Sequence, residues 1–233
     1  MWAILSGIEG NLAAYNAVLE DIKRQKMSIE DLYILGDLIA ANPESEKVVQ
    51  RIRFPDTNEL QPQVCLGWWE EQCLILHGLS ATAEPTELLE KYGPDTVKKL
   101  WESISLETAQ WLRSLNFGFV ELDCLLIHGS SISVSEELTL KTPPWQMLER
   151  LQRMEVNTLF CGRSGQVFEY HLQGGSIVSS VTTLEGQNRA NTSTDLSKRV
   201  IGVGNVGGTP GFATYTLFNP NNNQIQFQTV HYS

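Results

Sequence analysis

The sequence predicts a single α/β domain over residues 1–233. Short apolar segments at Trp2–Leu5, Leu32–Leu35 and Val64–Leu66 have the length and composition of buried strands, and each runs into a glycine-containing polar loop. From Leu12 onward, apolar residues recur three and four positions apart, as on one face of an amphipathic helix. Strands that alternate with helices indicate an α/β fold, and 233 residues are enough for a substantial core.

The first half of the chain is predicted to be mainly helical after each strand. Asn11 is a good N-cap for the first helix. The side of that helix expected to face the core carries Leu12, Tyr15, Val18, Leu19 and Ile22. Further helices are expected over Ser45–Arg53 and over residues 78–116, the second with a break at Gly93-Pro94 and an N-cap at Ser105.

The second half is predicted to contain more strands. The expected hairpins join Phe117–Leu122 to Cys124–Ile127, Val167–Leu172 to Ser176–Val181, and Ala213–Phe218 to Gln224–Tyr232. An amphipathic helix with Met147, Leu148, Leu151 and Met154 on one side is expected after Pro143-Pro144, before a strand at Thr158–Cys161. Residues 182–198 are polar and are expected to form a mobile loop.

The composition excludes several classes of function. The formal net charge of -10 argues against nucleic-acid binding, which needs a basic surface. No apolar run approaches the roughly 20 residues of a membrane span, and no basic segment precedes the first apolar run as in a signal peptide. The four cysteines (Cys65, Cys73, Cys124 and Cys161) form no CxxC pair, so we expect reduced core thiols in a cytoplasmic protein.

Polar or glycine-rich motifs follow five of the expected strands, and a further glycine-rich segment comes after the expected loop. The five motifs are Ser6-Gly7-Ile8-Glu9-Gly10-Asn11, Gly36-Asp37, Gly67-Trp68-Trp69-Glu70, His128-Gly129-Ser130 and Gly162-Arg163-Ser164-Gly165, and the further segment is Val200–Gly207. In open α/β sheets, ligands bind in the crevice outside the carboxyl ends of the strands. These loops are therefore the candidate site.

In order and position, these motifs resemble those of the calcineurin-like metallophosphoesterase superfamily, close to its bacterial phosphodiesterase branch. The resemblance covers nearly the whole chain. It implies a four-layer α/β/β/α sandwich in which two mixed sheets face each other with helices outside. It also implies a site for two metal ions, which would clamp the attacking and leaving oxygens of a phosphoester.

Most positions that the resemblance assigns to that site are altered. Gly7 and Glu9 stand where the family has Asp and His, Trp68 and Trp69 stand for Asn and the general-acid His, and Arg163 and Gly165 stand for two His residues. Asp37 and His128 match the family pattern. The chain thus resembles a degenerate member that lacks most metal ligands, and no residue is assigned a catalytic role.

The two tryptophans and the arginine carry specific expectations. An indole offers a metal no lone pair, so we expect Trp68 or Trp69 to pack into the former metal cleft; the alternative is an exposed partner-binding patch. Arg163 is expected to reach Asp37 or Glu9 and to replace the charge of the lost metal, since its guanidinium suits carboxylate contact. The alternative is that Arg163 extends into solvent.

Two functional readings follow from this resemblance. In the first, the protein is a catalytically inactive pseudoenzyme without a cofactor, which acts as a binding or regulatory scaffold for a protein or a small phosphate-containing ligand. In the second, it is a divergent phosphoesterase that hydrolyses phosphomonoesters or phosphodiesters with one divalent metal, Mn, Fe or Zn. The candidate ligands of that metal are Glu9, Asp37 and His128, with Glu70 as a further candidate.

Overall fold

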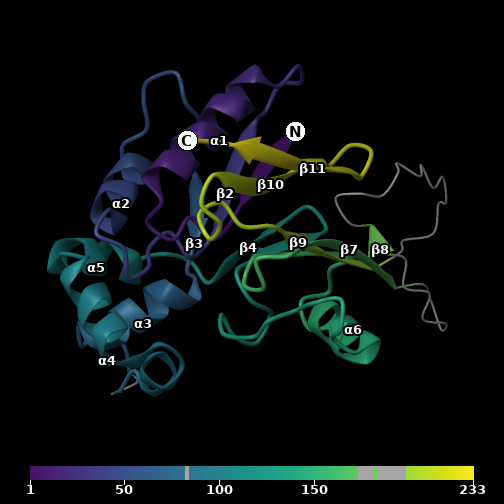
Figure 1. Cartoon of the computed structure of the whole chain (residues 1–233). Helices are drawn as coiled ribbons and strands as arrows, with labels where there is room; N and C mark the ends of the chain where they lie inside the picture. The colour runs from purple at the N-terminus through teal and green to yellow at the C-terminus, as the bar shows by residue number, and fades with distance from the viewer. Residues whose placement is uncertain (82–83, 173–180, 183–197) are drawn as a thin grey trace.

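The computed structural model describes residues 1–81, 84–172, 181–182 and 198–233, and its strands form two mixed sheets (Figure 1). The first sheet has the strand order β11-β10-β1-β2-β3. Its strands are β1 (Trp2–Leu5), β2 (Asp31–Leu35), β3 (Gln63–Cys65), β10 (Phe212–Asn219) and β11 (Gln224–His231). β1, β2 and β3 run parallel, whereas β10 is antiparallel to both β1 and β11.

The second sheet has the strand order β4-β5-β6-β9-β7-β8. Its strands are β4 (Gly118–Glu121), β5 (Cys124–Ile127), β6 (Thr158–Cys161), β7 (Val167–Leu172), β8 (Val181–Thr182) and β9 (Lys198–Val203). β5, β6 and β9 run parallel, while β4 and β7 are antiparallel to their neighbours. In each sheet, the carboxyl ends of three parallel strands therefore lie along one edge.

The described helices are α1 (Leu12–Arg24), α2 (Ser45–Arg53), α3 (Trp68–Leu76), α4 (Thr86–Glu102), α5 (Leu106–Arg113) and α6 (Pro144–Gln152). The two expected N-caps are present: Asn11 accepts a hydrogen bond from Ala14 N at 3.0 Å, and Ser105 accepts one from Thr108 N at 3.2 Å. The expected break in α4 lies at Gly93, whose φ of 78° takes the backbone out of the helix.

The start of the helical region differs from the prediction, which placed it at residue 78. A helix, α3, already begins at Trp68, directly after the third strand and Gly67. Seven of its nine residues are buried, on all sides of the helix. A helix buried all round shows no amphipathic period, and for that reason the sequence pattern missed it.

Three apolar cores separate the four layers. Trp2 and Ile4 point into the core between the two sheets, and the alternate residues Ala3 and Leu5 point into the core beneath the helices of the first sheet. A third core lies between the second sheet and α6. Burial on both faces explains why these strands are continuously apolar. The predicted α/β/β/α sandwich is confirmed.

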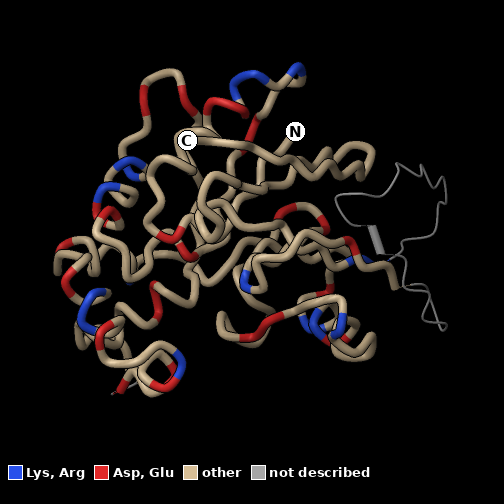
Figure 2. The backbone as a smooth tube through the Cα atoms, in the orientation of Figure 1, with Lys and Arg blue, Asp and Glu red and all other residues tan. Residues whose placement is uncertain are grey.

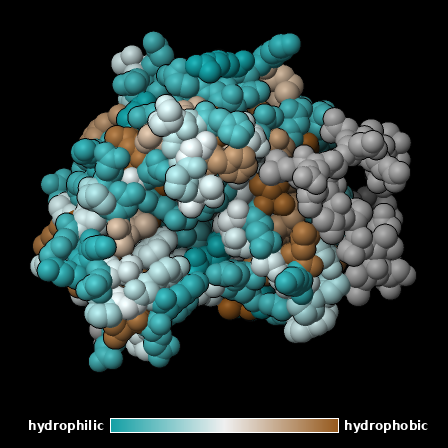
Figure 3. Space-filling view, in the orientation of Figure 1, coloured by the Kyte–Doolittle hydropathy of each residue, from teal (hydrophilic) through white to brown (hydrophobic). Residues whose placement is uncertain are grey.

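Most of the other predicted elements are confirmed. The hairpins β4–β5 and β10–β11 form as expected, and all four cysteines are free and buried. Most of the predicted strand Ser176–Val181 and of the predicted loop 182–198 lies outside the described residues; at the ends of that loop, Thr182 belongs to β8 and Lys198 to β9, so the prediction is wrong at these two positions. None of the described helices is both long and apolar enough to cross a membrane. Lys and Arg are interspersed with Asp and Glu in Figure 2, and hydrophobic residues lie in separate patches on the face shown in Figure 3.

Candidate functional site

The loops that follow the six parallel strands meet across the two sheets. Within the first sheet, Glu9 N donates to Asp37 O at 2.9 Å, which ties the first loop to the second. Across the sheets, the imidazole Nδ1 of His128 lies 2.7 Å from the carbonyl oxygen of Leu35 and donates to it, since a carbonyl can only accept. The sequence motifs therefore converge at one place, as the strand order requires.

Asp37 and His128 form the centre of this place. Nε2 of His128 lies 3.2 Å from Oδ2 of Asp37, and both side chains are almost wholly buried. Burial by itself would raise the pKa of Asp37, but His128, Arg163 and the N–H of Trp69 together bring it below its ordinary value. Burial would lower the pKa of His128, and the carboxylate of Asp37 raises it above its ordinary value. Each side chain thus favours the charged form of the other.

Glu70 is wholly buried, and its carboxylate accepts hydrogen bonds from backbone N–H groups. Its Oε2 accepts from Asp37 N at 2.7 Å and Gly67 N at 2.9 Å, and its Oε1 accepts from Leu38 N at 2.8 Å and Ile39 N at 3.1 Å. Burial, followed by the nearby charge of Asp37, raises the pKa of Glu70 to about 7. Both oxygens of this carboxylate are already committed to N–H donors, and Glu70 therefore fixes the Asp37 loop against the start of α3.

Arg163 lies with its side chain 7% exposed and does not extend into solvent. Its Nη1 is 3.9 Å from Oδ2 of Asp37, and its Nη2 is 3.7 Å from Oε1 of Glu137. The guanidinium carbon lies 4.5 Å from the ring centroid of Trp68, in cation–π distance. The expected contact with Asp37 is present as a single long ion pair, and no contact with Glu9 accompanies it among the interactions of the described residues.

Trp68 and Trp69 are buried at the first turn of α3. Trp68 is 0% exposed and Trp69 is 7% exposed, so the alternative of an exposed patch is wrong. Trp68 packs against Arg163, and both indoles pack against Tyr92 of α4 at centroid distances of 5.7 and 5.1 Å. The backbone N–H of Trp69 donates to Oδ1 of Asp37 at 2.8 Å. The indole of Trp68 thus lies against the cation that pairs with Asp37.

Asn205, in the loop after β9, fills the space beside Gly7 and Gly165. A Cβ added to Gly7 would lie 2.2 Å from Nδ2 of Asn205, and one added to Gly165 would lie 3.5 Å from its Cβ. The same Nδ2 donates to Oε1 of Glu9 at 2.8 Å. Burial raises the pKa of Glu9, and this hydrogen bond opposes the shift. An amide side chain therefore occupies the place that a side chain at position 7 would need, whereas at position 165 it would make only an ordinary contact.

The residues present do not fit a metal ion. Among the described residues, no group of three His, Cys, Asp or Glu side chains lies close enough together to hold one. Among the described candidates, Asp37 and His128 pair directly, whereas Glu9 is bonded to Asn205 and both oxygens of Glu70 accept from backbone N–H groups. The guanidinium of Arg163 stands 3.9 Å from Oδ2 of Asp37. A guanidinium and an indole offer a metal no lone pair, and the amide oxygen of Asn205 accepts from Gly208 N.

Sequence reasoning missed what Asn205 and Glu70 do. Asn205 lies in the predicted glycine-rich segment Val200–Gly207, and the glycine at position 7 was the signal of a space that another side chain could fill. Glu70 stands at the third helical position after Gly67, where an acidic residue binds free N–H groups at a helix start. Its additional bonds to residues 37–39 depend on the packing of α3 beside β2, which no local pattern reveals.

The fold has counterparts among solved structures. A metallophosphoesterase from Sphaerobacter thermophilus is similar with a TM-score of 0.72 and 19% identity, over 100% of this chain and 88% of that one. A hypothetical protein from Pyrococcus horikoshii OT3 is similar with a TM-score of 0.71 and 22% identity, over 100% and 89%. A putative diadenosine tetraphosphatase follows with a TM-score of 0.54 and 14% identity, over 98% and 93%.

No family model and no curated protein matches the sequence. Identities of this size establish the fold and nothing finer. The structural likeness extends over the whole chain, and the loops converge as the sequence motifs require. The chain has the metallophosphoesterase fold.

Proposed function

We propose that this protein is a catalytically inactive relative of the metallophosphoesterases and acts as a binding or regulatory scaffold. One observation carries the proposal: an amide and a guanidinium stand beside the positions that would have to supply metal ligands. Asn205 lies beside Gly7 and Gly165, and Arg163 lies beside Asp37. A two-metal phosphoesterase requires at least three good ligands on each ion, and neither half of this site supplies them.

The pseudoenzyme reading predicts negligible hydrolysis of bis-p-nitrophenyl phosphate, with or without added Mn. The protein should also purify without stoichiometric Mn, Fe or Zn when no chelator is used. Elemental analysis and a colorimetric assay measure both quantities. Turnover near the common enzyme range of roughly 1 per second that depends on metal and disappears in Asp37→Ala would refute the proposal.

A single-metal phosphoesterase remains the second candidate because of the orientation of His128. Its Nδ1 donates to Leu35 O, which leaves Nε2 facing Asp37, and a ligating histidine is commonly held in this way. Glu9 would have to leave Asn205 to join them. Asn205→Ser, which releases Glu9, is the informative variant, and a gain of one bound metal per chain in this variant would favour this candidate. Asn219→Ser, at the end of β10, is the control.

A further inference from the structure

Lys91 and Arg163 share a single carboxylate oxygen beside Trp68. Nζ of Lys91, on α4, and Nη2 of Arg163, in the loop after β6, each lie 3.7 Å from Oε1 of Glu137. Both distances exceed the range of a hydrogen bond, so each contact is a loose ion pair. The side chains of Lys91 and Glu137 are 47% and 46% exposed. The point at which the two cations meet is therefore open to solvent.

Two buried N–H donors beside this point have no acceptor. Nε of Arg163 and Nε1 of Trp68 are both buried, and neither has a hydrogen-bond partner among the described residues. The indole of Trp68 lies 4.5 Å from the guanidinium carbon of Arg163 and 5.7 Å from Nζ of Lys91, which places it against both cations. A buried donor without an acceptor is unfavourable. The protein thus supplies more donors here than acceptors.

The charges around Arg163 leave a positive charge for a ligand. Asp37 also faces this guanidinium, at 3.9 Å, but the imidazole of His128 lies 3.2 Å from the same carboxylate oxygen. Glu137 is then shared between two cations, Lys91 and Arg163. When the half-exposed side chain of Glu137 turns into solvent, both cations become available to an incoming anion.

We propose that a phosphate group binds between Arg163 and Lys91, in the place of the Glu137 carboxylate. A phosphate group carries about two negative charges and several acceptor oxygens. Each cation then has an oxygen of its own, and a guanidinium and an ammonium are both common phosphate binders. Glu137 is an internal competitor that the ligand displaces. The inference rests on the proposed function and names its ligand, because it assigns binding to protein cations and not to metal ions.

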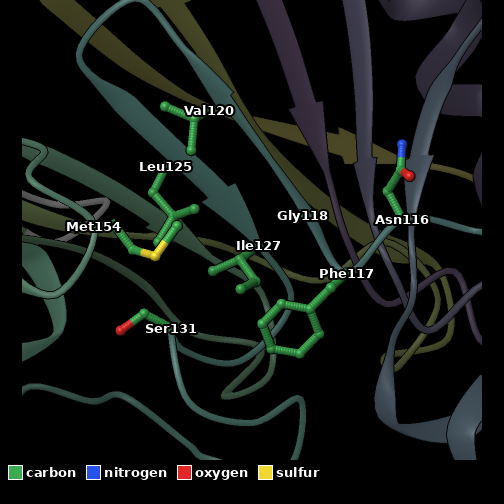
Figure 4. A pocket seen from close by; sticks show the side chains of 8 residues that line it. All are labelled: Asn116, Phe117, Gly118, Val120, Leu125, Ile127, Ser131 and Met154. Atoms are coloured by element: carbon green, nitrogen blue, oxygen red, sulfur yellow. The ribbon is translucent and has the colours of Figure 1, made fainter.

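The groove beside β4 is unsuited to the same ligand. It has a volume of about 280 Å³, and its described lining is largely apolar, with Phe117, Val120, Leu125 and Met154 among its side chains (Figure 4). Its described lining includes no charged side chain. An anion would lose its hydration there without gaining a counter-charge. The phosphate site is therefore assigned to the two cations beside Trp68.

Isothermal titration calorimetry with inorganic phosphate, in EDTA and at low salt, tests the site. The wild type should bind one phosphate per chain with a dissociation constant below about 1 mM. Lys91→Gln should raise this constant about fivefold and Glu137→Gln should lower it by a similar factor, as expected for half-exposed charges. Lys98→Gln, on the same helix, and Glu44→Gln, at a paired glutamate 45% exposed, are the matched controls and should change it less than about twofold.

Sodium acetate distinguishes a phosphate ligand from a carboxylate. Acetate, with a single charge and two oxygens, should bind at least roughly tenfold more weakly than phosphate. Arg163→Lys, which keeps a charge beside Asp37 but not the planar fork, should also weaken phosphate binding. Acetate binding as tight as that of phosphate would overturn the proposal. So would a lack of phosphate binding in this range, or binding insensitive to both Lys91→Gln and Glu137→Gln.

These outcomes are separate from the test of the proposed function. Metal-dependent hydrolysis of bis-p-nitrophenyl phosphate would refute that function whatever the calorimetry in EDTA shows. An inactive, metal-free protein that binds no phosphate would overturn the present proposal alone, and would leave the scaffold to a protein partner.

Discussion

Asp37 depends on positive charge from its neighbours, because it is buried. Its carboxylate lies 3.2 Å from His128 and 3.9 Å from Arg163, and its own side chain is 6% exposed. A buried charge that loses its partner is strongly destabilising, whereas an exposed pair is worth little. The two cations at this residue can therefore be examined separately.

The contribution of Arg163 can be measured by a double-mutant cycle. Arg163→Ala should reduce the free energy of unfolding by about 3 kcal/mol, because it leaves the Asp37 carboxylate less compensated in a buried place. Arg163→Ala combined with Asp37→Asn should recover part of this loss. Chemical denaturation provides the values, and Lys98→Ala, in an exposed i,i+4 pair on α4, should cost under about 1 kcal/mol. If the losses in free energy of unfolding at positions 37 and 163 are strictly additive, Arg163 does not replace the charge of a metal beside Asp37.

The contribution of His128 should depend on pH. Its pKa is raised in the folded state, so its stabilisation is complete below the unfolded value of about 6.5 and is lost as the pH rises through the folded value. His128→Asn keeps an N–H for Leu35 O and should reduce the fall of unfolding free energy between pH 6 and 8 by up to about 1.4 kcal/mol per pH unit. Part of the fall should remain, because the raised pKa of Glu70, about 7, acts in the same direction.

Denaturant titrations at several pH values measure this slope, with His231→Asn, at an exposed imidazole, as the control. An unchanged slope in His128→Asn would show that the imidazole is neutral throughout.

The positions of the site residues were predictable, and two of their roles were not. Asp37, His128 and Arg163 follow strands, so the strand order alone brings them together. The filling of the Gly7 space by Asn205 joins residues 198 positions apart in the sequence. Such a contact depends on the two sheets facing each other, and it lies beyond any local pattern.

At the scale of elements, the first half of α4 covers the two buried indoles. Tyr92 packs on both of them, and Lys91 lies 5.7 Å from the Trp68 ring and pairs with Glu137 at 3.7 Å. Glu137 in turn pairs with Arg163. The helix leaves its regular path immediately afterwards at Gly93, and this break lets the first half lie over α3.

Acrylamide quenching tests this cover. In a variant with phenylalanine at Trp2, Trp101, Trp111 and Trp145, the fluorescence of Trp68 and Trp69 should be quenched several-fold less than that of free tryptophan, since burial excludes the quencher. Tyr92→Ala in the same background should increase quenching. Leu89→Ala, at a residue 48% exposed on the same half-helix, should not. If the variant that keeps only Trp68 and Trp69 is quenched as efficiently as free tryptophan, α4 does not cover the two indoles in solution.

At the scale of the whole molecule, the order of the motifs was a stronger guide than their residues. Each motif follows a strand, and the strands alternate with helices in a fixed sequence, so the sandwich was predictable although most ligand positions are altered. The structural counterparts at 19% and 22% identity share the fold over the full length of this chain. The helix α3 was not predictable, because its burial on all sides depends on what packs against it.

The position of Asn205 also restricts the mutational paths open to this protein. An aspartate introduced at position 7 would need its Cβ within 2.2 Å of the amide nitrogen of Asn205, at a backbone φ of +64° that side chains rarely adopt. An aspartate at position 7 therefore requires the Asn205 side chain to leave this space and to give up its hydrogen bond to Glu9. Restoring the first ligand of a metal-binding loop thus depends on a second change at residue 205, in its conformation or in its identity.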